Sequence, residues 1–90
     1  MLFRSDTSLI TGYRYFVDTT SARTLTLSAS PSVGDEVTVF DASGSAGTNN
    51  ITIARNGKLI NGNAGNFIID ISGSSYRLTY TGSTYGWSVK

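Results

Sequence analysis

The side chains that carry most nucleophilic and metal chemistry, histidine and cysteine, are absent from this sequence of 90 residues. A Ser–His–Asp or Cys–His arrangement cannot be built without them, and a zinc, copper or haem site is not expected. Cleavage of a glycan would need two carboxylates facing one cleft. Asp35 and Glu36 are adjacent, so on a strand they would point to opposite faces. We therefore expect that this protein is not an enzyme. The weaker alternative is a glycan depolymerase that uses the carboxylates of Asp41 and Asp70.

The segment that begins at Asp41, with the sequence DASGS, weakly resembles a calcium loop built from oxygen ligands. Such loops use a second and a third acidic residue, and this segment lacks them. We therefore expect Asp41 to cap a turn. No metal and no cofactor is predicted.

Two cations flank the dipeptide Asn56–Gly57, which is a strong signal for a tight hairpin turn. Arg55 and Lys58 would lie at the tip of this hairpin, where they could hold a phosphate or a carboxylate of a partner. Solvated charge beside a turn is the simpler interpretation. We keep both residues as candidate partner contacts.

Aromatic residues gather near the C-terminus, and rings of this kind can stack on sugar faces. Tyr80, Tyr85 and Trp87 are the candidate glycan contacts. Tyr76 and Tyr80 would share a strand face with Leu78, which favours a core or a subunit interface instead. Trp87 is also a candidate for closing the core.

Short runs of alternating apolar and polar residues extend along most of the chain, each ended by Gly, Asn, Asp or Ser. A period of two places one set of side chains on a buried face. About eight short strands at regular spacing predict an all-β fold, a small antiparallel β-sandwich or barrel. The expected strands cover residues 13–17, 24–28, 36–40, 51–55, 58–60, 66–71, 76–80 and 87–90, and residues 41–50 form the longest expected loop.

The first eleven residues show no sustained period, so we predict an extended N-terminal arm over residues 1–11 and a β module over residues 12–90. The arm carries Phe3, Leu9 and Ile10. These side chains would pack on their own domain or on a neighbouring chain. All three are candidate partner contacts.

Length and charge narrow the class of partner. A chain of this size buries only about 60–65% of its unfolded surface, and without disulfides or metal the remaining means of stabilisation is oligomerisation. The formal net charge is +1, with basic and acidic residues scattered singly, so no nucleic-acid surface is expected. No stretch approaches the roughly 20 apolar residues of a membrane span, and no signal peptide is recognisable.

Taken together, residues 20–90 resemble a module found in virion proteins of tailed bacteriophages, notably in tail-fibre chains of cyanophages. Four segments carry the resemblance: residues 25–35 (LTLSASPSVGD), 37–44 (VTVFDASG), 48–57 (TNNITIARNG) and 80–87 (YTGSTYGW). In tail fibres this module is one part of a longer trimeric chain. A chain without a shaft, coiled coil or anchor domain looks more like a capsid decoration or cement protein.

The resemblance implies a structural protein of the virion, made in the host cytoplasm and placed on the capsid exterior or the tail. Its expected partners are the major capsid protein or other virion proteins, and a homotrimer is the expected assembly. The alternative is a tail-fibre or receptor-binding module that contacts a host surface glycan or protein. Neither nucleic acid nor membrane is an expected partner.

Overall fold

The computed structural model describes residues 2–90, and in this range the chain forms strands and turns without any helix. The all-β prediction is confirmed. Over these residues no helix has the length and apolarity needed to cross a membrane. The strands are β1 (Leu2–Phe3), β2 (Thr7–Ser8), β3 (Arg14–Val17), β4 (Arg23–Thr26), β5 (Glu36–Asp41), β6 (Ile51–Ala54), β7 (Phe67–Ile69), β8 (Ser75–Tyr80) and β9 (Trp87–Val89).

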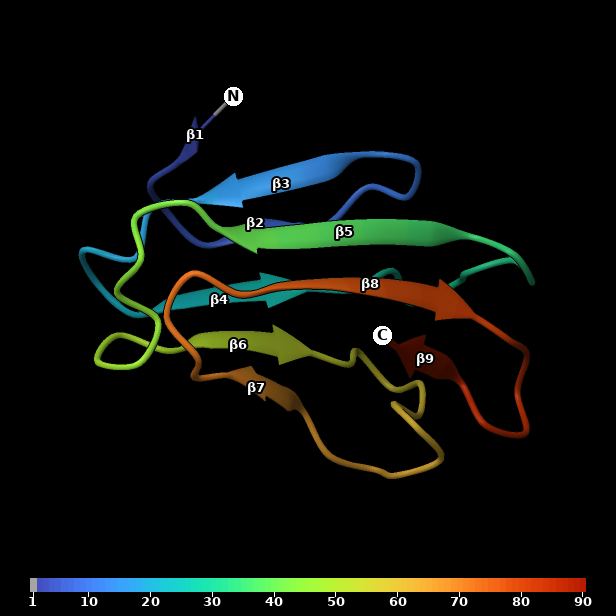
Figure 1. Ribbon diagram of the computed structural model, residues 1–90. Helices are drawn as coiled ribbons and strands as arrows, with labels where there is room; N and C mark the ends of the chain where they lie inside the picture. Colours follow the sequence, from blue (N-terminus) through green and yellow to red (C-terminus); the bar gives the residue numbers. More distant parts are fainter. Residues whose placement is uncertain (1) are drawn as a thin grey trace.

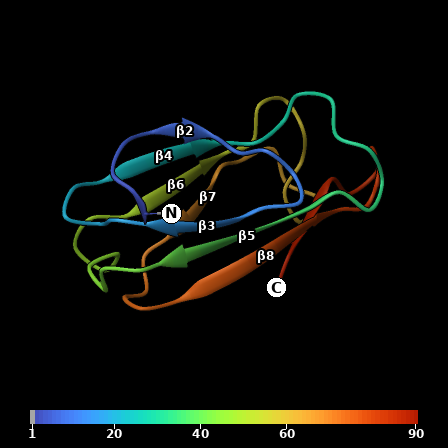
Figure 2. The ribbon, with the colours of Figure 1, turned by 90° about the horizontal axis from the view of Figure 1, so that it is seen from above.

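The strands form two sheets that face each other (Figures 1 and 2). The first sheet has the order β1-β3-β5-β8-β9, and the second has the order β2-β4-β6-β7. From β1 to β6 the chain alternates between the sheets, so each strand pairs with the strand two places later in the chain, as β1 does with β3. These neighbours are parallel because the chain crosses to the other sheet and returns before it pairs again.

The prediction of an antiparallel sandwich or barrel was wrong about the strand directions. Among the named strands of residues 2–90, pairing is parallel from β1 through β3 to β5 and from β2 through β4 to β6, and antiparallel at β5–β8, β6–β7 and β8–β9. Neither sheet closes on itself, since each begins and ends with a different strand. Side-chain alternation has the same period in both kinds of ladder, so the sequence pattern contained no information about direction.

One hydrophobic core lies between the two sheets. The first sheet contributes alternate residues such as Val37 and Val39, and the second contributes Leu25, Ile51 and Ile53, all at most 1% exposed. The strand positions between them face outward. The predicted alternation therefore holds in both sheets.

The predicted N-terminal arm forms two edge strands instead. β1 lies at the edge of the first sheet and β2 at the edge of the second. Leu9 is only 4% exposed, and its N–H donates a hydrogen bond of 2.8 Å to the carbonyl of Thr26. Part of this segment thus belongs to the core; Met1 lies outside the described residues.

The Asn56–Gly57 turn forms as predicted, with positive φ angles of 51° and 88°. The expected return strand over residues 58–60 does not form a ladder with β6. Ile60 instead bridges Trp87 in parallel, and the N–H of Asn61 donates to the carbonyl of Trp87 at 2.7 Å. The segment that follows the turn therefore lies along β9 of the first sheet.

Candidate functional site

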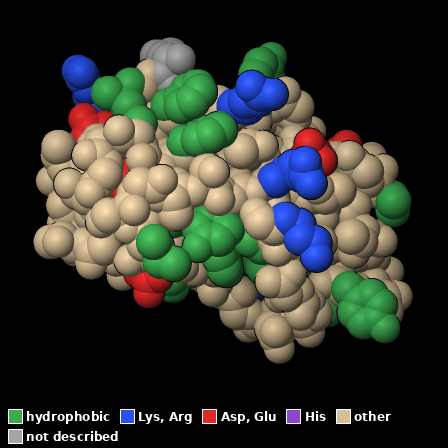
Figure 3. All heavy atoms as spheres, viewed as in Figure 1, with side chains coloured by type: hydrophobic (Ala, Val, Ile, Leu, Met, Phe, Trp, Pro, Cys, Tyr) green, Lys and Arg blue, Asp and Glu red, His purple; other side chains and the backbone are tan. Residues whose placement is uncertain are grey.

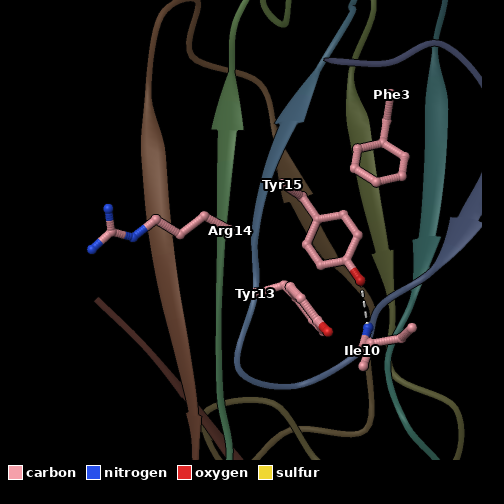
Figure 4. Close-up of a pocket in the computed structure, with 5 residues that line it drawn as sticks. All are labelled: Phe3, Ile10, Tyr13, Arg14 and Tyr15. Atoms are coloured by element: carbon pink, nitrogen blue, oxygen red, sulfur yellow. Dashed lines mark hydrogen bonds between the residues drawn. The ribbon is translucent and has the colours of Figure 1, made fainter. Parts of the chain in front are cut away.

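A shallow, mostly apolar cavity lies at the N-terminal edge of the first sheet. Its volume is about 320 Å³, and it is bordered by β1, the turn before β3, and β3 itself. The N–H of Ile10 donates to the Tyr15 hydroxyl at 2.7 Å, and the rings of Phe3 and Tyr15 lie 4.8 Å apart (Figure 4). The lining residues are Phe3, Ile10, Tyr13, Arg14 and Tyr15.

The three predicted arm contacts have different surroundings. Ile10 is 62% exposed and Phe3 is half-buried at the cavity wall, so both are accessible to a partner at this edge. Leu9 belongs to the core, so its assignment as a partner contact is corrected. An apolar residue in an aperiodic segment gives no sign of which way it faces, so the sequence could not separate Leu9 from Ile10.

Tyr13 was not among the predicted contact residues, because the expected strand over residues 13–17 places it on the same face as Tyr15. In the structure β3 begins at Arg14, and Tyr13 lies between this strand and the preceding turn, where it is 61% exposed. Gly12 has a φ of 91° and marks this turn. That glycine was the sequence signal for the boundary.

Asp41 is buried and makes four hydrogen bonds. Its Oδ1 accepts from the Thr19 hydroxyl at 2.6 Å and from the N–H of Gly44 at 3.0 Å. Its Oδ2 accepts from the N–H of Ala46 at 3.0 Å and from that of Gly73 at 2.8 Å. The prediction that Asp41 caps a turn is confirmed, and the same carboxylate also ties three loops together.

These hydrogen bonds decide what the Asp41 carboxylate can do. Burial raises the pKa of Asp41, but the hydrogen bonds from Thr19 and from the backbone of Gly73, Ala46 and Gly44 outweigh it and hold the pKa below the ordinary value of 3.8. Across residues 2–90 no group of three or more acidic side chains could hold a metal ion. The geometry assigns Asp41 a structural role.

The two cations at the Asn56–Gly57 turn are half-buried. The guanidinium of Arg55 donates from Nη1 to the carbonyl of Lys58 at 3.0 Å, so it closes its own turn. The Arg55 N–H donates to Oδ1 of Asn66 at 3.1 Å. A role of Arg55 and Lys58 in gripping a partner stays a prediction.

The predicted glycan contacts do not form one platform. Trp87 is fully buried and Tyr80 is 6% exposed, with their rings 5.4 Å apart inside the core. Neither ring can stack on a sugar, so these two assignments are corrected; the alternative that Trp87 closes the core is confirmed. Tyr85 lies in the turn before β9 and is 69% exposed.

Charged and aromatic side chains also share the outer face of the first sheet, which Figure 3 shows. Arg14 and Phe16 alternate with the buried Tyr15 and Val17 along β3, so they project from this face. In Figure 4 Arg14 points away from Tyr15 and the cavity. This face was not predicted as a contact surface.

No protein-family model matches the chain, and no curated protein matches it significantly. The resemblance to phage virion modules therefore stays a prediction.

Proposed function

We propose that this chain is a structural protein of a tailed-phage virion, a decoration or cement protein that binds the head shell and stabilises it. The two facing sheets would act as a compact sandwich that carries contact surfaces rather than catalytic groups. The resemblance of residues 20–90 to virion modules supports the assignment to a phage virion. Exposed apolar side chains at the N-terminal edge of the first sheet support the mode of action.

The observation that carries the proposal is a cluster of exposed apolar side chains at the N-terminal edge. Ile10 and Tyr13 are 62% and 61% exposed, and Leu2 and Phe16 are 38% and 39% exposed. Fully burying one side chain of this size contributes about 1.5–3 kcal/mol. Burial against a shell subunit would therefore favour both binding and the folded state of a small domain.

The backbone at this edge supports the same mode of action. β1 pairs with β3 only through Leu2–Phe16 and Phe3–Val17, and its other side faces no described strand. An open edge of this kind can accept a strand from another chain. The expected partner is the major capsid protein or another virion protein, and the expected assembly is a homotrimer.

Empty capsids of the parent phage provide the test, because the chain offers matched variants. Ile10→Ser and Tyr13→Ser remove apolar surface at the edge, whereas Ile71→Ser and Tyr85→Ser remove side chains of the same type that are 59% and 69% exposed elsewhere. We expect the first pair to raise the Kd for capsids about tenfold each, and the second pair to leave it unchanged.

Light scattering of the free protein measures the assembly, and circular dichroism checks that each variant is folded. Equal capsid binding by all four variants would remove the apolar edge from the mechanism. Failure of the unmodified protein to bind capsids would reject the decoration role.

The second candidate is a tail-fibre or receptor-binding module that contacts a host surface glycan. Exposed cations and aromatic rings on the outer face of the first sheet favour it. Saturable binding to host cells, without binding to capsids, would assign the protein to the tail.

A further inference from the structure

Three cations form a row across the outer face of the first sheet. Arg14 lies opposite Thr38, and Thr38 lies opposite Arg77. Arg77 and Lys90 exchange two backbone hydrogen bonds, of 3.1 and 2.9 Å. Residues that lie directly opposite one another in a sheet project from the same face, and all three cations are exposed. Figure 3 shows the Lys and Arg side chains gathered on this face.

An apolar row runs beside the cations, two residues further along the strands. Leu2 lies opposite Phe16, and Phe16 lies opposite Phe40. The two phenylalanine rings are stacked, with centroids 4.9 Å apart and an angle of 24° between their planes. Two residues along a strand correspond to about 7 Å, so ring surfaces and cations lie within reach of one ligand.

Little negative charge offsets the row. Glu36 is the carboxylate that β5 places on this face; it contacts Arg77 at 3.7 Å and accepts from the Thr79 hydroxyl at 3.1 Å. Both partners of the ion pair are at least half exposed, so solvent screens their interaction and Arg77 can exchange Glu36 for another anion. The face is thus complementary to an anionic ligand.

The sheet itself limits the kind of ligand. β3, β5 and β8 are interior strands whose backbone groups are paired with neighbours on both sides, so a peptide strand finds no main-chain partners on this face. A polysaccharide needs only side chains: guanidinium groups bind carboxylates, and aromatic rings contact the apolar C–H faces of sugars. Arg14 and Arg77 lie two strands apart, about 10 Å, which is comparable to the length of a disaccharide unit.

We propose that the outer face of the first sheet binds a linear acidic polysaccharide. Carboxylates of alternate sugars pair with Arg14 and with Arg77 and Lys90, and sugar rings pack on Phe16 and Phe40. The proposal does not depend on binding to capsids, because it is measured on the isolated protein; Phe16 belongs both to this face and to the apolar edge.

Calorimetric titration with polygalacturonate at low ionic strength tests the proposal. We expect the double variant R14Q/R77Q to weaken binding about tenfold or more, and added salt to weaken binding of the unmodified protein. Glu36→Gln removes the carboxylate that competes for Arg77, so it should strengthen binding. Arg4→Gln is the matched control, since Arg4 is 75% exposed but lies beside Asp18, outside the row.

Two further ligands separate the polysaccharide from other occupants. Dextran, which is neutral, should not bind. Poly-L-glutamate should bind more weakly than polygalacturonate, and Phe16→Leu with Phe40→Leu should reduce only the binding of polygalacturonate. Absence of polygalacturonate binding, an equal loss in Arg4→Gln, or equal affinity for both polyanions would overturn the proposal.

Discussion

Asp41 shows how one side chain can hold several loops. Its two oxygens accept hydrogen bonds from Thr19, from Gly44 and Ala46 in the loop after β5, and from Gly73 in the turn before β8. A buried carboxylate is stable only where donors replace the lost water. The four donors here meet that requirement.

Asp41→Asn tests this role. In one position the amide nitrogen would face the N–H groups of Ala46 and Gly73, and in the other it would face the N–H of Gly44. We therefore expect the free energy of unfolding to fall by about 2–4 kcal/mol in urea titrations. Asp70→Asn is the control, because Asp70 is exposed and should change it by less than about 0.5 kcal/mol.

The pH dependence of the unfolding free energy gives a second, independent test of Asp41→Asn. The pKa of Asp41 is lower in the folded chain than its ordinary value of 3.8, so this stabilisation is present above pH 3.8 and is lost as the pH falls through the folded value. Asp18, whose pKa is lowered first by the backbone N–H of Thr20, acts in the same direction. Asp41→Asn should therefore flatten the loss of stability in acid, and an unchanged slope would contradict this account.

At the scale of elements, the segment after the Asn56–Gly57 turn protects the end of the first sheet. The Trp87 N–H donates to the Leu59 carbonyl at 2.8 Å, and the Gly62 N–H donates to the Tyr85 carbonyl at 2.8 Å. This segment therefore pairs with the chain at the start of β9, whereas β1 at the opposite edge has no described strand beyond it. The two ends of the sheet thus differ in what they offer to a partner.

Gly86→Ala tests this covering segment. Gly86 has a φ of 74°, and a Cβ there would collide with the Leu59 carbonyl oxygen. We expect a loss of about 2–4 kcal/mol in unfolding free energy, with faster hydrogen exchange at the Asn61 and Gly62 amides.

Gly65→Ala is the matched control for this prediction, because its Cβ would meet open space. Its stability and exchange rates should stay close to those of the unmodified protein. Unchanged exchange at Asn61 in Gly86→Ala would show that the segment is not held by this contact.

At the scale of the whole molecule, both sheets depend on one core. Leu25 of the second sheet and Trp87 of the first are both fully buried in it. The strands from β1 to β6 also alternate between the two sheets, so neither sheet is built from one continuous segment of the chain. We expect the chain to unfold as a single unit.

Leu25→Ala tests this unity, since Trp87 is the single tryptophan and reports on the opposite sheet. The variant should lose about 2–5 kcal/mol, and its urea midpoints from Trp87 fluorescence and from circular dichroism should shift together. Val33→Ala, at a site 74% exposed, should shift neither. Separate midpoints for the two signals would show that the sheets unfold independently.

Local patterns in the sequence determined several of the strands, several turns and the class of fold. Alternation placed strands at 36–40, 51–55 and 76–80, close to β5, β6 and β8. The Asn56–Gly57 turn and the capping role of Asp41 were also predictable, because both depend on residues close in sequence. The absence of histidine and cysteine excluded the chemistry that those side chains carry.

Only the tertiary structure decided which strands pair, in which direction, and which alternate side chains face the core. Parallel and antiparallel ladders share the period of two, so the crossing between sheets was not visible in the pattern. Burial of Leu9, Tyr80 and Trp87, and the row of Arg14, Arg77 and Lys90, depend on contacts between distant segments. The two candidate contact surfaces, the apolar edge and the outer face of the first sheet, form only when these strands pair, because no single strand contains all the residues of either surface.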